Sequence, residues 1–231
     1  MTILALEFSS PQRSVAVARG GRVLGEVIET STGLHPDQKA GASPRQSGAT
    51  EAFSMIEAAL REAKLEREQI EILAVGLGPG SYTGVRVAIS MAQGWQLARG
   101  AKLLGVSSMD GLAAQARAEG IFGRVNVMVD AQRNEFYLAT YEISAGGWNA
   151  VAPLRILTVG EIQSRTEARE IFIGPEVTRW FPGSRTIFPR AATLAQLAVE
   201  QSDFVTGEKL KPIYLRETNY AKVPPRKPAT R

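Results

Sequence analysis

The chain has 231 residues, 44% of them hydrophobic and 22% charged, which indicates a folded globular protein with one large core or two small ones and excludes a disordered chain. It contains one His and no Cys, which excludes a disulfide framework, a thiolate nucleophile and a zinc site built on sulfur or on several histidines. The formal charge of +4 comes mostly from residues 216–231, which hold five cations and one acid, so it is weak support for nucleic-acid binding.

The first ten residues do not resemble a secretory signal. They carry no basic residue, and Glu7 interrupts their short apolar run. Polar, charged or glycine residues also interrupt every other apolar stretch before it reaches the length of a membrane span. We therefore expect a cytoplasmic protein without membrane contact.

Residues 3–8, 14–19 and 22–30 are predicted to form three antiparallel strands. Each run is rich in apolar and β-branched residues, and Gly20-Gly21 supplies a tight turn between the second and the third. The first run is followed by polar residues at its turn, where a carboxylate and two hydroxyls could meet phosphates or hydrated magnesium. A plain turn that binds nothing is the alternative.

A loop and an amphipathic helix are predicted next. Residues 31–44 have loop composition, and His35 within them is either a proton shuttle or, more simply, an exposed loop histidine. Residues 45–64 space their apolar side chains by three and four, which predicts a helix with one apolar face.

A glycine-rich loop at residues 78–84 (GPGSYTG) joins a predicted strand at 70–77 to a predicted helix at 85–99. Free backbone N–H groups at a helix N-terminus bind phosphate well, yet this spacing matches neither a Walker loop nor a dinucleotide fingerprint. Phosphate contact and a tight turn that binds nothing both remain open. The candidates for nucleotide or phosphate contact are Glu7, Ser9, Ser10, Gly78, Gly80, Ser81 and Thr83.

The rest of the chain alternates between predicted strands and helices. Strands are expected at 102–106, 125–129, 135–143, 151–157 and 171–174, and helices at 107–119, from Thr158, and at 193–201. Two similar halves of sheet and helix would suit this count. Asp130, Arg133 and Glu135 could form an acid-base cluster, but a structural Asp that caps its own turn is favoured. Residues 216–231 are basic and proline-rich, which favours a solvated tail.

Five segments together resemble the TsaB (YeaZ) family, in that family's order: residues 3–10 (ILALEFSS), 78–86 (GPGSYTGVR), 105–109 (GVSSM), 130–137 (DAQRNEFY) and 212–216 (PIYLR). The resemblance implies an α/β protein with the actin-like ATPase (ASKHA, ribonuclease H-like) fold, with two lobes that each combine a mixed sheet and flanking helices. We expect lobes at 1–106 and 107–215, with the last helix packed back on the first lobe, and a tail at 216–231.

The same resemblance implies a role in the bacterial complex that places threonylcarbamoyl on adenosine 37 of tRNA. In that complex the family is a non-catalytic scaffold for the metal-bearing paralogue TsaD, joined by the ATPase TsaE. It therefore implies no catalytic residue, no metal and no cofactor beyond a weak contact with ATP or ADP. It also implies that tRNA is met through the assembled complex, and that a homodimer forms when the paralogue is absent.

Two departures from the family pattern bear on chemistry. The family's first strand usually ends Asp-Thr-Ser, whereas this one ends Glu7-Phe8-Ser9, which counts against a direct magnesium or phosphate role there. The catalytic paralogue carries a His-x-x-x-His metal pair at the start of the first helix, and residues 43–51 contain no histidine. This chain is therefore not expected to hold the catalytic metal.

The first two predicted helices carry more apolar surface than one sheet face can cover, which invites association. In the family they pack on their counterparts in TsaD as a four-helix bundle, and the alternative is that all these side chains are core. The corresponding interface candidates are Phe53, Ile56, Leu60, Ala88, Met91 and Trp95. The rival functions are a nucleotide-binding ATPase or small-molecule kinase and, disfavoured by the single histidine, a glycoprotease-like peptidase.

Overall fold

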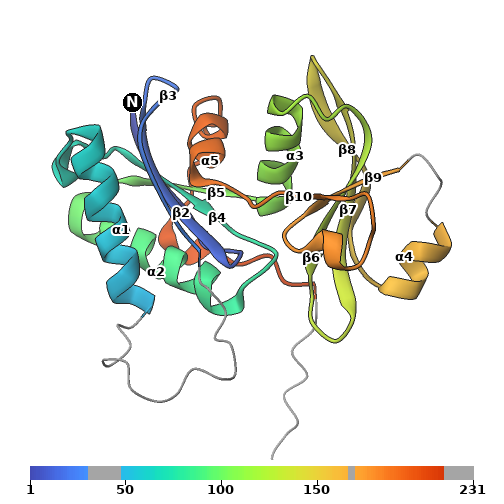
Figure 1. Cartoon of the computed structure of the whole chain (residues 1–231). Coiled ribbons are helices and arrows are strands. Elements are labelled where there is room, and N and C mark those ends of the chain that lie inside the picture. Colours follow the sequence, from blue (N-terminus) through green and yellow to red (C-terminus); the bar gives the residue numbers. More distant parts are fainter. Residues whose placement is uncertain (31–47, 166–169, 216–231) are drawn as a thin grey trace, which may run out of the picture.

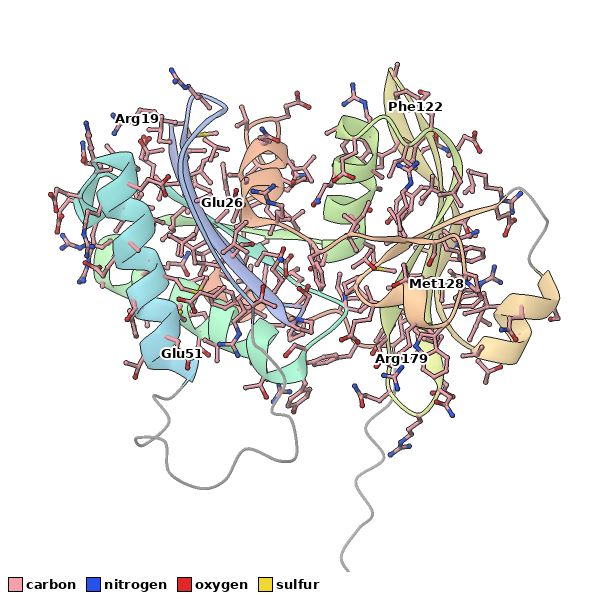
Figure 2. All side chains as sticks on the ribbon, in the orientation of Figure 1. Arg19, Glu26, Glu51, Phe122, Met128 and Arg179 are labelled. Atoms are coloured by element: carbon pink, nitrogen blue, oxygen red, sulfur yellow. The ribbon has the colours of Figure 1, made fainter. Side chains whose placement is uncertain are left out.

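Two five-stranded mixed sheets with helices packed on their faces make up the protein (Figure 1). The computed structural model describes residues 1–30, 48–165 and 170–215. Side chains fill the space between sheets and helices; Met128 lies inside the second half, whereas Arg19 and Glu51 project outward from the first (Figure 2). His35 and residues 216–231 lie outside the described ranges.

The first sheet has the strand order β3-β2-β1-β4-β5. Its strands are β1 (Thr2–Glu7), β2 (Gln12–Arg19), β3 (Arg22–Thr30), β4 (Ile72–Gly76) and β5 (Lys102–Val106). β1 to β3 form an antiparallel meander, and β4 and β5 continue the sheet parallel to β1. Every residue of β1 is buried, because helices cover both faces of the sheet at this central strand.

The second sheet repeats this topology with the order β8-β7-β6-β9-β10. Its strands are β6 (Gly123–Asp130), β7 (Glu135–Ser144), β8 (Gly147–Thr158), β9 (Ile171–Gly174) and β10 (Arg185–Thr186). β6 to β8 are an antiparallel meander, and β9 and β10 follow in parallel. Each half thus places its first strand at the centre, which confirms the predicted actin-like, ribonuclease H-like fold of two mixed sheets.

Helices from both ends of the chain cover the first sheet. α1 (Gly48–Ala63) and α2 (Tyr82–Arg99) pack on one face over Leu4 and Leu6, and α5 (Ala191–Leu197) packs on the other over Ile3 and Ala5. Period-two alternation along β1 sends its side chains to these two separate cores. α3 (Ser108–Ala118) covers the second sheet and also contacts α5, while α4 (Val159–Arg165) packs on that sheet's opposite face.

Several predicted boundaries shift in the structure. α2 begins at Tyr82 rather than at residue 85, because the Ser81 hydroxyl accepts a hydrogen bond from the Gly84 amide and caps the helix inside the glycine loop. α3 is capped by Ser107, one of the two predicted caps. β8 is longer than predicted because it pairs with β7 over its whole length, from Gly147 opposite Ser144 to Thr158 opposite Glu135.

Some elements gave no sequence signal. β10 has two residues and the 3₁₀ helices η1 (Arg67–Gln69), η2 (Val177–Arg179) and η3 (Gly207–Lys209) have three each, too few for a periodic pattern. The predicted lobe boundary after residue 106 stays a prediction. None of the helices within the described ranges has the length and apolar character to cross a membrane.

Candidate functional site

Glu7, at the end of β1, is fully buried and bound to the protein itself. One carboxylate oxygen, Oε1, accepts the Ser9 amide at 2.7 Å, and the other, Oε2, accepts the Ser108 hydroxyl at 2.8 Å. Burial raises the pKa of this carboxyl above its ordinary value, since the lost hydration outweighs the hydrogen bonds from Ser9 and Ser108, which lower it. Both oxygens are thus engaged inside the fold.

Three backbone donors of the glycine loop are also engaged within the protein. The Gly78 amide donates to the Ser108 hydroxyl at 3.2 Å, and the Ser81 amide donates to the Ser9 carbonyl at 2.7 Å. The Gly84 amide donates to the Ser81 hydroxyl at 3.2 Å. A phosphate at this helix N-terminus would have to compete with these bonds.

Close backbone approach explains two of the loop's glycines. A Cβ atom added to Gly80 would lie 2.0 Å from the Ser9 carbonyl oxygen, and one added to Gly84 would lie 2.0 Å from the Phe8 carbonyl oxygen. The loop therefore packs directly on the turn that follows β1. This contact supports the tight-turn interpretation of the motif.

The structure brings most of the predicted phosphate candidates together, although not as an open site. Glu7, Ser9, Gly78 and Gly80 meet where the loop packs on the first turn. Ser10 is 5% exposed and donates its hydroxyl to the Gln12 carbonyl, while Thr83 points into the groove described below. Nucleotide contact by these residues stays a prediction.

An apolar groove of about 800 Å³ runs between α1 and α2. Its apolar lining includes Phe53, which is 55% exposed, and the half-buried Met91 and Trp95. Charged side chains also line it, among them Arg86 and the ion pair of Arg67 with Glu57, whose atoms approach to 2.5 Å. No segment in the described part of the chain covers the groove side of these two helices, whose other side packs on the first sheet. The surplus of apolar side chains on the two helices predicts such an open apolar surface.

Three interface candidates are buried in the core of the isolated chain. Ile56, Leu60 and Ala88 are 1%, 4% and 0% exposed because they point from α1 and α2 toward the first sheet. Their burial in the isolated chain supports the alternative that they are core, and partner contact by them stays a prediction. Periodicity places a side chain on a helix face but does not say which part of an apolar face the sheet covers. Ile56 is also one of the residues that line the groove.

Sequence reasoning missed an aromatic cluster at the N-terminal end of α2. Tyr214 stacks on Tyr82 with ring centroids 5.4 Å apart, and the Arg86 guanidinium lies 3.9 Å from the centre of the Tyr82 ring. Tyr214 lies more than a hundred positions from Tyr82 and Arg86 in the chain. The segments that carried the resemblance include all three residues, Tyr82, Arg86 and Tyr214, but gave no sign that they meet.

The turn from Asp130 to Glu135 has a structural explanation. The Asp130 carboxylate oxygen Oδ1 accepts a hydrogen bond from the Gln132 amide at 2.7 Å. This bond supports the turn-capping interpretation over an acid-base cluster. Gln132, Arg133 and Asn134 all have positive φ, from 59° to 67°. The Asp130 cap and a bond from the Val159 amide to the Asn134 carbonyl hold this strained backbone in place.

No group of three or more His, Cys, Asp or Glu side chains in the described ranges is arranged to hold a metal ion.

The raised pKa of Glu7 has a consequence for the stability of the protein. We expect the free energy of unfolding to fall as the pH rises from the pKa of an exposed glutamate to the higher pKa of folded Glu7, because the folded state holds its proton more tightly.

The substitution Glu7→Gln should flatten this part of the stability profile, since the amide does not titrate. Urea unfolding of both proteins over a pH series measures the difference. Glu142→Gln, at an exposed position on β7, is the matched control and should leave the slope as it is. Equal slopes for the natural chain and Glu7→Gln would contradict the prediction.

A family model and several relatives match this chain. The model for TsaD, described as tRNA N6-adenosine threonylcarbamoyltransferase, matches residues 22–199. The chain is 27% identical to the tRNA threonylcarbamoyladenosine biosynthesis protein TsaB of Escherichia coli, over 70% of this chain and 78% of that protein. It is 34% identical to the tRNA N6-adenosine threonylcarbamoyltransferase of Dinoroseobacter shibae, over 51% of this chain and only 33% of the transferase.

A solved structure extends the similarity to three dimensions. YeaZ from Pseudomonas aeruginosa superimposes with a TM-score of 0.74 at 26% identity, over 93% of this chain and 99% of that one. A superposition over this share of the chain takes in residues of both sheets. The chain corresponds to about a third of the Dinoroseobacter transferase and to nearly all of the Pseudomonas protein.

Proposed function

The chain belongs to the TsaD family of tRNA N6-adenosine threonylcarbamoyltransferase proteins and resembles its TsaB (YeaZ) members, and from that premise we propose that it is a non-catalytic scaffold subunit in threonylcarbamoyladenosine synthesis on tRNA. It binds a TsaD-type catalytic paralogue in the cytoplasm and supports it together with a TsaE-type ATPase. Transfer RNA is engaged by the assembled complex.

The observation that carries the proposal is the apolar groove between α1 and α2. Exposed Phe53 and half-buried Met91 and Trp95 form a continuous apolar lining with charged side chains around it. Aromatic and Met side chains of this kind are enriched at the centres of protein interfaces. A partner that lays two amphipathic helices along α1 and α2 would remove this surface from water.

The proposal of a non-catalytic role rests on side-chain chemistry. The whole sequence has one histidine, so it cannot supply a His-x-x-x-His pair for a catalytic metal. The buried carboxylate of Glu7 has both oxygens bound by Ser9 and Ser108, which leaves it poorly placed to hold magnesium. These two features support the scaffold over an actin-like ATPase or kinase, and the single histidine also counts against a peptidase.

Affinity purification of the tagged full-length chain from its own cytoplasm tests the proposal. We expect a one-to-one complex with a paralogue that contains the His-x-x-x-His pair, identified by mass spectrometry and by the native mass of the product. Recovery of the chain alone, or only with itself, would overturn the scaffold proposal. The nucleotide-binding alternative would then be tested by ATP turnover and its dependence on Glu7.

A further inference from the structure

Arg86 is the one charged residue of the groove lining that has no ion pair within residues 1–30, 48–165 and 170–215. Of the other charged lining residues, Glu57 pairs with Arg67, and Arg99 pairs with Glu68. α2 itself contains no Asp or Glu that could neutralise Arg86. The groove therefore presents a single positive charge that the described part of the chain leaves without a counter-charge.

This charge lies at the N-terminal end of α2. Helical side chains lean toward the N-terminus, and the Arg86 guanidinium accordingly lies 3.9 Å from the centre of the Tyr82 ring, on the first residue of the helix. The aligned peptide dipoles make this same end of a helix positive, and its first turn holds no acidic residue. Arg99, which is already paired, is roughly 20 Å further along the helix. A negative group on a partner is thus favoured at the Arg86 end of the groove.

Contacts with two tyrosine rings hold the Arg86 side chain in place. Tyr214 stacks on Tyr82 with ring centroids 5.4 Å apart, and the Arg86 guanidinium also lies 5.8 Å from the centre of the Tyr214 ring. The Ile213 amide donates to the Leu77 carbonyl at 2.9 Å, which anchors the segment that carries Tyr214. Ring contacts leave the N–H donors of an arginine available to a carboxylate. Because the side chain is already ordered, less conformational entropy is lost when a partner binds.

We propose that a carboxylate on the partner's helices pairs with Arg86, and that this ion pair sets the register and the identity of the partner in the groove. The inference rests on the proposed function, in which a paralogue lays two amphipathic helices along α1 and α2. Apolar contacts alone allow one helix to slide along another, whereas a charged pair specifies one position. A second copy of this chain is a poorer occupant at α2, because that helix offers no acid.

The test is titration calorimetry of the full-length chain with the catalytic paralogue, for the natural chain, Arg86→Gln and Arg86→Lys. The matched control is Arg61→Gln, an exposed cation on α1 that lies outside the groove lining and has no ion pair in the described part of the chain. We expect Arg86→Gln to raise the dissociation constant at least about tenfold. Arg86→Lys should lose less, because it keeps the charge but not the planar fork of donors, and the control should match the natural chain.

A salt series and a double-mutant cycle identify the interaction as an ion pair. The difference between the natural chain and Arg86→Gln should narrow as the salt concentration rises. Each Asp or Glu on the two helices of the paralogue is changed to Asn or Gln, and one of these changes should weaken the natural chain but not Arg86→Gln further. Arg86→Glu should bind about a hundredfold more weakly or worse, and an Arg in place of that carboxylate should restore part of the affinity.

Two results would overturn this inference: an unchanged affinity in Arg86→Gln, or a loss that Arg86→Lys does not relieve and that couples to no carboxylate of the paralogue. The second result would mean that the guanidinium only packs on the tyrosine rings. Urea unfolding should give the natural stability for Arg86→Gln, since the side chain is exposed.

The same titrations separate this inference from the scaffold proposal. If the natural chain does not bind the paralogue, the scaffold proposal fails and the ion pair fails with it. If the natural chain binds and Trp95→Glu weakens the complex while Arg86→Gln does not, the groove is the partner surface and the ion pair alone fails.

Discussion

Replacement of Gly84 by Ala is expected to destabilise the protein by about 3 kcal/mol or more, the upper end of the cost of overpacking. The added Cβ would lie 2.0 Å from the Phe8 carbonyl oxygen, where real contacts are never so short. The two nearest atoms are the backbone carbonyl oxygen and carbon of Phe8, which cannot move away by a rotamer change. Either α2 must shift off the sheet or the turn after β1 must open.

The matched control is Gly94→Ala on the same helix. An added Cβ at Gly94 meets nothing within 4 Å, so the better helix propensity of Ala should stabilise the chain by about 0.5 to 1 kcal/mol. Urea unfolding followed by circular dichroism measures both variants. Gly84→Ala with the stability of the natural chain would show that the loop does not pack on the first turn as described.

Replacement of Trp95 by Glu is expected to weaken binding of the catalytic paralogue by about 2 to 4 kcal/mol, the range of a central aromatic hot spot. The indole is half-buried in the wall of the groove, and its Nε1 has no hydrogen-bond partner in the described part of the chain. A carboxylate in its place would remove apolar contact and would lose its hydration under a partner helix. The dissociation constant from titration calorimetry is the measurement.

Two further variants separate an interface effect from a folding effect. Phe53→Glu changes a side chain that is already 55% exposed, so it should weaken the complex with little change in unfolding. Leu97→Glu, on α2 at 88% exposure and outside the groove, should leave the complex intact. If both Trp95→Glu and Phe53→Glu bind the paralogue like the natural chain, the groove is not the partner surface.

The fold implied by the resemblance is the observed one, and the element order predicted from local sequence patterns agrees with it. The meander of residues 3–30 gave the first three strands, and strand, loop and helix followed in the order that places β4 and β5 beside β1. The second half repeats the same strand order. The predicted ends of helices were less accurate where a capping side chain sets the first residue, as Ser81 does at the start of α2.

The candidate site was predicted less completely, for a reason that particular residues make plain. Apolar spacing placed Phe53, Leu60 and Ala88 together on helix faces, yet only Phe53 is exposed. The difference depends on how far each helix leans over the sheet, which periodicity does not encode. The contact of Tyr214 with Tyr82 was equally invisible, because nothing local links residues so distant in the chain.

The sequence by itself determined the kinds of element, the lack of thiol chemistry and of a histidine pair, and the position of the surplus positive charge. These properties depend on residue type and local order. Only the tertiary structure decided that Glu7 turns inward to Ser9 and Ser108, that the loop glycines are needed for close packing, and that Tyr214 stacks on Tyr82 beside the groove. Each of these depends on contacts between distant segments, and the relative positions of such segments are fixed by packing of the whole core.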